Sequence, residues 1–216
     1  VNNGDYMVRS TLITVIDDTP PTRIAGANRI MTAVDISREA FPGGLDGAKA
    51  VVLANSDAWA DALPASALAG AVRGPLMLSA STSVSPAVIA ELDRLGAQKV
   101  YLVGGEAVLS AAVKSQLEGA GYSVVRLGGN TRYDTAQLIS AEVNKVVGRT
   151  EGGTVFLVTG VDFPDALSAS SLAAKLAAPI LLTKQYEMPG ATDRALQALQ
   201  PDRVVVCGGT SVVSDI

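Results

Sequence analysis

The 216-residue sequence has no histidine and a single cysteine, Cys207. Without histidine, the chain cannot build a Ser/His/Asp triad, a Cys/His pair or a histidine-ligated metal site, which excludes many classes of enzyme. With one cysteine it has no intrachain disulfide, so its fold depends on a hydrophobic core. We expect Cys207 to be a small buried hydrophobic residue, because it occupies the position of Val103 in an internal repeat described below.

Excess positive charge and long apolar runs are also missing. The formal net charge is −4 and the charges are scattered, which argues against a nucleic-acid partner. The longest apolar runs, such as residues 204–207, are strand-sized and far shorter than the ~20 residues of a membrane-spanning helix. The first residues do not show a charged start followed by an apolar core, so we expect any targeting segment to have been removed or not included.

What the sequence does contain is an internal duplication with an offset of 103 to 104 residues. Three blocks recur in the same order, and the first has five of eleven positions identical and the second eight of seventeen. The matched blocks are residues 23–33 with 126–136, 53–69 with 157–173, and 100–105 with 204–209. This period is too long for a solenoid unit, so the sequence predicts two small tandem domains.

Strand-length apolar runs alternate with helical patterns through both copies. This alternation predicts an α/β fold in which each copy builds a parallel sheet covered by helices. The expected strands are 51–54, 76–78, 100–103, 124–127, 155–158, 180–182 and 204–207, and the expected helices are 28–41, 62–72, 85–95, 110–118, 133–147, 166–178 and 192–199. The helices at 62–72 and 166–178 are rich in small residues, which favours close packing between the repeats.

The domain boundaries follow from these patterns. We expect a leader strand and Pro-Pro linker at 1–22, a first copy at 23–125 and a second copy at 126–216. The second copy stops before the helix and strand that end the first. We therefore expect that it is incomplete at its C-terminus and that the natural protein continues.

Two arginines occupy the same place in the repeat, Arg29 and Arg132, each just inside the start of a helix. A cation there opposes the helix dipole, so the position calls for an anionic partner. One interpretation is a structural ion pair with Asp61 or Asp165, the acid that both copies share. The other is binding of an anionic ligand.

Asp61 and Asp165 each precede Ala-Leu and follow an aromatic residue by two positions. A carboxylate there can cap the following helix through its free N–H groups, which stabilises it by ~1 kcal/mol. The alternative is a divalent cation held with the neighbouring Asp57 or Asp162. Since those pairs differ in spacing, we expect no metal site and no cofactor.

A glycine pair ends the third strand of each copy, Gly104-Gly105 and Gly208-Gly209. Such a pair can form a tight turn, or a nest of backbone N–H groups that binds an anion. The sequence has neither a GxGxxG nor a GxxxxGK[ST] motif, which argues against nucleotide binding.

Four motifs taken together resemble the cell wall binding repeat 2 family of surface proteins. They are R-x-x-G-x-x-R-x-x-T-A, D-A-L after an aromatic residue, P-I-L-L-T, and a strand ending in G-G. The resemblance covers residues 23–216. It implies small Rossmann- or toprim-like repeats, usually three about a pseudo-threefold axis, on the outside of Gram-positive-type cells. It also implies that the P-I-L-L residues Ile180, Leu181 and Leu182 take part in binding. The first copy departs from this element with P-L-M-L-S at 75–79.

The function that the resemblance implies is non-catalytic, non-covalent anchoring to an anionic polysaccharide of the cell wall. Candidate contacts are the arginines, aspartates, glycine pairs and P-I-L-L residues named above. We also expect a further repeat or a homo-oligomer partner to cover the small-residue helices. The alternatives are a protein–protein scaffold on the cell surface and a small α/β enzyme that uses aspartates at strand ends.

Overall fold

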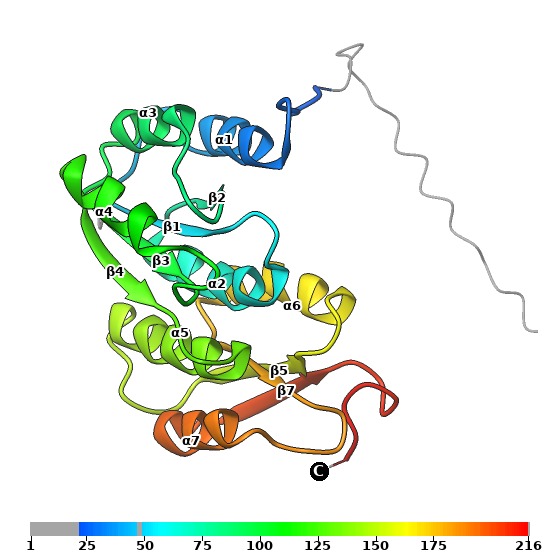
Figure 1. Ribbon diagram of the computed structural model, residues 1–216. Coiled ribbons are helices and arrows are strands. Elements are labelled where there is room, and N and C mark those ends of the chain that lie inside the picture. The colour runs from blue at the N-terminus through cyan, green and yellow to red at the C-terminus, as the bar shows by residue number, and fades with distance from the viewer. Residues whose placement is uncertain (1–21, 47–48, 216) are drawn as a thin grey trace, which may run out of the picture.

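The computed structural model describes residues 22–46 and 49–215, in which helices and strands alternate (Figure 1). The first repeat consists of α1 (Arg29–Ala40), β1 (Ala50–Asn55), α2 (Trp59–Val72), β2 (Leu76–Ser79), α3 (Pro86–Arg94), β3 (Lys99–Val103), α4 (Ala111–Gly119) and β4 (Ser123–Leu127). The second consists of α5 (Arg132–Val146), β5 (Thr154–Thr159), α6 (Pro164–Leu176), β6 (Ile180–Thr183), α7 (Gly190–Leu199) and β7 (Arg203–Cys207). The leader strand and linker were predicted for residues 1–22, and all of this segment except residue 22 lies outside the described residues.

The strands form two parallel sheets, in the orders β2-β1-β3-β4 and β6-β5-β7. In each sheet the chain moves outward from the central strand to one neighbour and then returns to the other side, as in Rossmann-like folds. The prediction of two tandem α/β repeats is confirmed, with a smaller second sheet. None of the helices in the described part of the chain is long and apolar enough to span a membrane.

Helices cover the sheets on both faces (Figure 1). One face of the first sheet packs against α1, α3 and α4, and the other against α2. In the second repeat α6 and α7 contact the sheet, while α5 runs past edge strand β6 and also contacts α2 and α7. The two repeats therefore meet through α2, α5 and α6.

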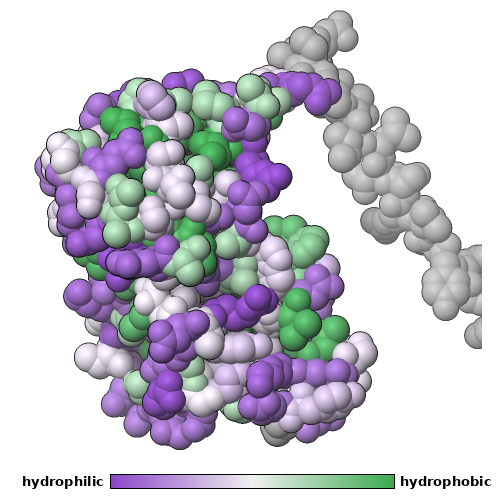
Figure 2. Space-filling view, viewed as in Figure 1, coloured by the Kyte–Doolittle hydropathy of each residue, from purple (hydrophilic) through white to green (hydrophobic). Residues whose placement is uncertain are grey.

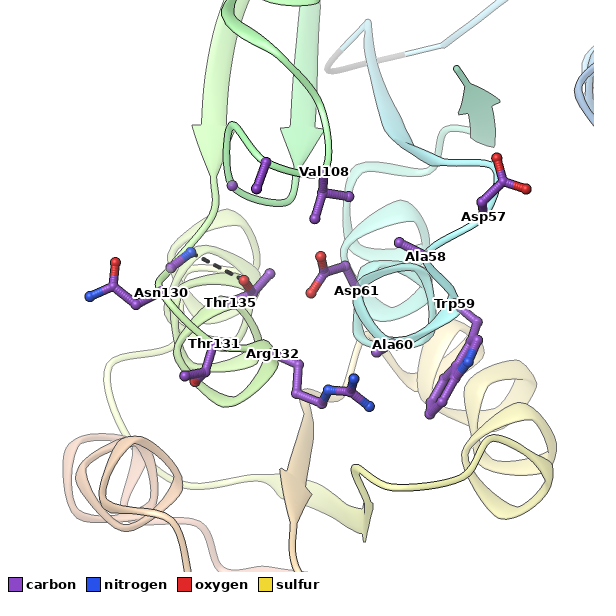
Figure 3. A pocket seen from close by; sticks show the side chains of 13 residues that line it. Asp57, Ala58, Trp59, Ala60, Asp61, Val108, Asn130, Thr131, Arg132 and Thr135 are labelled. Carbon is purple, nitrogen blue, oxygen red and sulfur yellow. Dashed lines mark hydrogen bonds between the residues drawn. The ribbon is translucent and has the colours of Figure 1, made fainter. Parts of the chain in front are cut away.

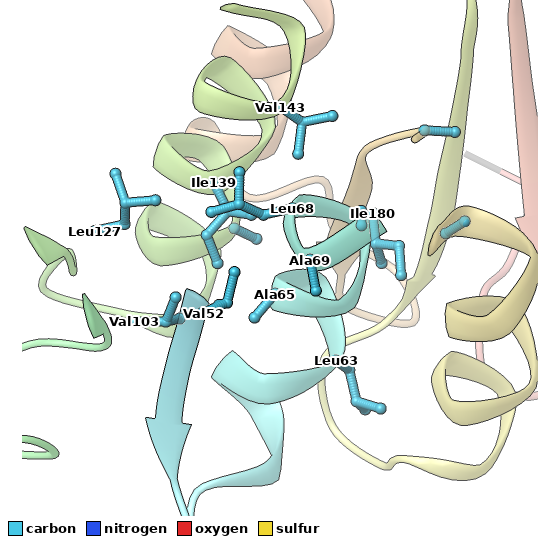
Figure 4. Packing of buried hydrophobic residues seen from close by; sticks show 14 of the residues in the cluster. Val52, Leu63, Ala65, Leu68, Ala69, Val103, Leu127, Ile139, Val143 and Ile180 are labelled. Atoms are coloured by element: carbon cyan, nitrogen blue, oxygen red, sulfur yellow. The ribbon is translucent and has the colours of Figure 1, made fainter. Parts of the chain in front are cut away.

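The contact between the repeats is a hydrophobic core that both share. It contains Leu68 of α2, Ile139 of α5 and Phe156 of β5, each at most 2% exposed. Figure 4 shows Leu68 beside Ile139, between the helices of the two repeats. Since burial of apolar area is the main stabilising contribution to folding, the repeats stabilise each other.

Small side chains let α2 and α6 approach closely, as the sequence predicts. A Cβ atom added to Gly70 of α2 would lie 2.0 Å from the carbonyl oxygen of Ala174 in α6. No side chain other than hydrogen fits at this crossing.

The predicted helix starts are confirmed where a polar side chain precedes the helix. Asn28 accepts a hydrogen bond from the Met31 N–H at the start of α1, and Ser85 caps α3 ahead of a proline in its first turn. Ser110 does precede α4, but its hydroxyl makes no capping bond and is buried without a partner.

A buried carboxylate joins α1 to α3. The side chain of Glu91 is inaccessible to solvent and accepts hydrogen bonds from Ser37 at 2.6 Å and from two nitrogens of Arg94 at 2.7 and 2.8 Å. Arg38 approaches to 3.4 Å. The second repeat has Ala195 at the corresponding position, so this cluster belongs to the first repeat alone.

The environment predicted for β7 is wrong. Val204 and Val206 are 42% and 50% exposed, and Cys207 is half-buried instead of buried. In the first sheet β4 lies beside β3, and Val100 and Leu102, the counterparts of Val204 and Val206, share a hydrophobic cluster with residues of α4. Among residues 22–46 and 49–215, no strand lies beside β7 on the side away from β5, and no helix follows it. Burial, followed by the charge of Asp165, raises the pKa of the Cys207 thiol.

Candidate ligand-binding site

A cavity of about 310 Å³ lies where the two repeats meet, beyond the carboxyl ends of the strands of the first sheet (Figure 3). This is the edge at which parallel α/β sheets usually bind ligands. We call it the junction pocket. Its lining comes from the start of α2 (residues 57–61), the loop after β3 (Gly105, Ala107, Val108) and the start of α5 (residues 129–132 and Thr135).

Arg132 lies in the junction pocket and is held in place by neutral partners. Its Nη1 donates to the carbonyl oxygen of Gly160, and its guanidinium lies 5.3 Å from the ring centroid of Trp59. The Trp59 ring in turn packs against Phe163, with 5.9 Å between centroids. Among the described residues, no carboxylate lies within 4.0 Å of its guanidinium. The ion pair with Asp61 or Asp165 that was one interpretation is therefore not formed.

Asp61 is brought to the same pocket but does not cap a helix. It lies inside the first turn of α2, whose N-cap Ala58 makes no side-chain bond, and it is only 7% exposed. Burial raises the pKa of the Asp61 carboxyl above its ordinary value, although Arg132 and Thr135 act to lower it. The capping role predicted for Asp61 is wrong, because the helix begins two residues before it.

The glycine pair after β3 forms a turn above Asp61. Gly104 has φ +113°, and a Cβ atom there would lie 3.1 Å from Asp61 Oδ2. Its N–H donates to the Leu127 carbonyl at 2.8 Å, so this donor is not available to a ligand. Gly105 lines the junction pocket.

Arg126 of β4 fixes this loop from the other side. Its Nη1 donates to the carbonyl oxygens of Gly104 and Leu109, at 2.9 and 2.7 Å, and its Nη2 donates to that of Ser110 at 3.2 Å. Burial lowers the pKa of Arg126, while the charge of Glu106 acts to raise it. The first arginine of the repeated motif thus positions a wall of the junction pocket.

Arg29 repeats only part of what Arg132 does. Its Nη1 donates to the Ser56 carbonyl at 3.0 Å, the counterpart of the bond from Arg132 to Gly160. It also pairs with Asp57 at 2.6 Å, and both side chains are largely exposed. Arg29 is not among the residues that line the junction pocket.

The second repeat holds half of an equivalent site. Asp165 lies in the first turn of α6, and a Cβ atom on Gly208 would lie 2.8 Å from its Oδ2, as at Gly104 and Asp61. The capping role predicted for Asp165 is wrong as well, since α6 has no side-chain cap bond. Gly208, with φ +125°, and Gly209 form the matching turn. No segment of the described chain stands here in the place that residues 129–132 take in the first site.

The P-I-L-L residues are in the core. Ile180, Leu181 and Leu182 form β6 and are each 0% exposed. Ile180 and Leu182 belong to the core shared by the repeats, and Leu181 faces α7. Their side chains can therefore act on the junction pocket only by positioning the helices around it.

The junction pocket brings together groups that can bind a ligand. A guanidinium, an indole face and polar groups of Asp57, Asn130 and Thr131 surround it, together with the N-termini of α2 and α5. Within the described residues no group of three or more Asp, Glu or Cys side chains is placed to hold a metal ion. Sequence reasoning did not identify Trp59, Asn130 or Thr131 as part of the site. The signal was present, because the block 126–136 begins within the last strand of the first repeat.

One protein-family model matches most of the chain. The sequence model of cell wall binding domain 2 (CWB2) matches residues 23–114 and 126–216. N-acetylmuramoyl-L-alanine amidase LytC of Bacillus subtilis is 31% identical over 202 residues, which is 94% of this chain and 39% of that protein. The amidase enhancer of the same organism is 29% identical over 212 residues, 98% of this chain and 27% of that protein. The chain thus spans well under half of either relative.

Solved structures give the same result for the fold. Cwp6 from Clostridium difficile superposes with a TM-score of 0.79 at 29% identity, over 88% of this chain and 29% of that one. Cwp8 from the same organism superposes with a TM-score of 0.76 at 31% identity, over 88% and 31%. Like the relatives above, both are much longer than this chain.

Proposed function

Since this chain belongs to the cell wall binding domain 2 family, we propose that it anchors a surface protein non-covalently to an anionic polysaccharide of the bacterial cell wall. The family and its structural neighbours support a cell-wall binding role. The proposal adds the anionic ligand, the junction pocket as its site, the absence of catalysis and a location outside the cell.

The proposal rests on the position of Arg132 and on its lack of a carboxylate partner. Its guanidinium faces the junction pocket, is oriented by Gly160 and Trp59, and has no carboxylate partner among the described residues. Of the two carboxylates at the pocket, Asp57 is paired with Arg29, and burial raises the pKa of the Asp61 carboxyl above its ordinary value. A negatively charged group of a polymer would complete this arrangement.

The remaining lining suits a sugar chain. Trp59 offers an apolar ring, while Asn130 and Thr131 offer hydrogen-bonding groups for hydroxyls. The N-termini of α2 and α5 add partial positive charge. In this proposal Gly105 contributes backbone contacts, and Gly104 and residues 180–182 position the site without touching the ligand.

A second site of the same kind would strengthen binding to a polymer. Asp165, Gly208 and Gly209 form the first half of a second site, which a further repeat or a second copy would complete. Linked weak sites raise apparent affinity for a polymer without any one site being strong. Arg29 would be the arginine of such a neighbouring site.

Replacing Arg132 with alanine is the direct test. We expect binding to purified cell walls in sedimentation assays to weaken by roughly tenfold or more, as for loss of hydrogen bonds to a charged group. Arg132→Lys should fall between wild type and alanine, because it keeps the charge but loses the planar contact with Trp59.

The matched control is Arg194→Ala, which removes an exposed arginine from α7 outside the junction pocket. It should leave wall binding within about twofold of wild type, because exposed ion pairs contribute little. Equal binding by the Arg132 and Arg194 variants, with both folded by circular dichroism, would show that Arg132 is structural and the pocket is not the site.

A scaffold that binds surface proteins is the alternative function, favoured by the exposed apolar face of α6. Walls stripped of their anionic polymer separate the two. We expect the chain to lose binding to stripped walls and to regain it when the purified polymer is added back. Undiminished binding to stripped walls would support the scaffold.

A further inference from the structure

The junction pocket contains a buried carboxylate that the fold alone does not explain. Asp61 is 7% exposed, it does not cap α2, and no cation of the described residues lies within 4.0 Å of it. A buried carboxylate without such a partner costs free energy. Its place in the first turn of α2 offsets only part of that cost, through the helix dipole.

The neighbours of Asp61 leave part of its carboxylate open to the pocket. Gly104 lies close to one oxygen, since a Cβ atom there would be 3.1 Å from Oδ2. From α5, the Thr135 hydroxyl acts as a hydrogen-bond donor to the carboxylate, and the charge of Arg132 acts from farther away. Figure 3 shows the carboxylate between Val108 and Arg132. A carboxylate has about four acceptor positions, so one hydroxyl leaves most of them free, and Asp61 lines the junction pocket.

A cation and a buried acceptor therefore face the same cavity. The guanidinium of Arg132 is held by the Gly160 carbonyl and the Trp59 ring, and it does not reach Asp61. The cavity of about 310 Å³ gives a ligand access to both groups. An anion that binds Arg132 also approaches the negative charge of Asp61, which opposes it. Hydrogen-bond donors on the same ligand would offset this repulsion, because they would pair with the carboxylate.

The rest of the lining is mixed in character. Trp59 supplies an aromatic ring, and Asn130 and Thr131 supply polar groups. Figure 2 shows the same mixture on the surface, where hydrophilic residues lie beside hydrophobic ones at the junction of the two repeats. A sugar ring matches such a lining, because it has hydroxyls at its edge and C–H groups on its faces.

We propose that Asp61 makes the junction pocket selective for a sugar unit that carries both a negatively charged group and free hydroxyls. The negative group binds Arg132, and hydroxyls of the same unit donate hydrogen bonds to the Asp61 carboxylate. An anion without hydroxyls leaves this carboxylate unpaired and is repelled by it. The inference rests on the proposed function and adds to it the residue that discriminates between anionic ligands.

Two ring compounds of equal charge test this selectivity in the wild-type chain. Glucose 1-phosphate carries a phosphate and free hydroxyls, whereas cyclohexyl phosphate carries the same phosphate on a ring without hydroxyls. Trp59 is the only tryptophan of the sequence, so its fluorescence reports the binding of either compound to the junction pocket. We expect glucose 1-phosphate to bind roughly tenfold more tightly or better, as for hydrogen bonds to a charged acceptor.

Asp61→Asn should remove most of this preference. Asparagine keeps the shape of the side chain but loses the charge that repels an anion without hydroxyls. Cyclohexyl phosphate should therefore bind the variant several-fold more tightly than it binds wild type. The preference for glucose 1-phosphate should fall to about twofold or threefold, because its hydroxyls no longer meet a charged acceptor.

The control is Asp193→Asn, which neutralises an acid in the first turn of α7, outside the junction pocket. It should leave both affinities within about twofold of wild type. The proposal is overturned if wild type binds the two compounds equally or binds neither. It is also overturned if Asp61→Asn keeps the full preference, or if the variant binds both compounds more weakly by the same factor, which would make the carboxylate structural.

Wall binding separates this inference from the function on which it rests. If Arg132→Ala loses wall binding while wild type binds the two compounds equally, the anchoring site stands and only the selectivity is wrong. If Arg132→Ala keeps wall binding while wild type prefers glucose 1-phosphate, the pocket selects sugars as proposed but is not the site of anchoring.

Discussion

Gly70→Ala should destabilise the protein by about 2 kcal/mol, even though alanine is the better helix former. The added methyl group would lie 2.0 Å from the carbonyl oxygen of Ala174, a backbone atom of α6 that cannot rotate away. The two helices would have to separate and loosen the core that both repeats share. Thermal unfolding should show a melting temperature lower by roughly 4–8 °C for a chain of this size.

Gly119→Ala is the matched control. Gly119 ends α4, and a Cβ atom there would meet nothing within 4 Å. Alanine should therefore leave stability unchanged or raise it by up to ~1 kcal/mol, by restricting the unfolded chain. If the Gly70 variant melted at or above the wild-type temperature, the close crossing of α2 and α6 would be incorrect.

Glu91→Gln should have the second large effect, a loss of about 2–3 kcal/mol at neutral pH. The amide keeps the shape of the side chain but cannot accept both charged hydrogen bonds from Arg94. The loss is smaller than is usual for a broken buried ion pair, because Arg94 is 32% exposed and can reach water.

The stability difference between wild type and Glu91→Gln should become smaller as the pH falls. Burial alone would raise the pKa of Glu91, but hydrogen bonds from Arg94 and Ser37 outweigh it and place the pKa below the ordinary value of 4.5. A lowered pKa in the folded state stabilises the protein above the unfolded-state value, and this contribution disappears as the pH falls through the folded-state pKa. Denaturant unfolding should therefore show a full difference between wild type and variant at pH 7, and a shrinking one below about pH 4.5.

Glu187→Gln provides the comparison, since its ion pair with Lys184 is exposed. Its stability should stay within ~0.5 kcal/mol of wild type at every pH. A Glu91 variant that behaved in the same way would show that the cluster between α1 and α3 contributes nothing to the fold.

Local structure could be predicted from the sequence because its causes are local. Asn28 and the Ser85-Pro86 pair mark helix starts by side-chain chemistry, and continuous apolar runs mark strands covered on both faces. The small residues of α2 predicted a close helix contact, which occurs at Gly70. The duplication supplied the division into two α/β repeats.

The errors concern neighbours that lie far away in the sequence. The apolar run of β7 resembles that of β3, but its burial depends on a second neighbouring strand and a covering helix, as β4 and α4 supply for β3, so Val206 and Cys207 are more exposed than expected. Asp61 has the residue type of a helix cap, yet the helix begins earlier and the carboxylate points to the second repeat. For the same reason, no pattern within one copy shows that the junction pocket takes one wall from each.

The position of β4 affects how a protein of this kind can gain repeats during evolution. This strand completes the sheet of the first repeat, yet it carries Arg126, the first residue of the second repeated block. A duplicated gene segment that begins at one such arginine and ends before the next would encode the strand that pairs with the sheet of the preceding repeat. Lengthening by tandem duplication would then require no new interface to evolve, because every added segment would bring a strand already fitted to the preceding sheet.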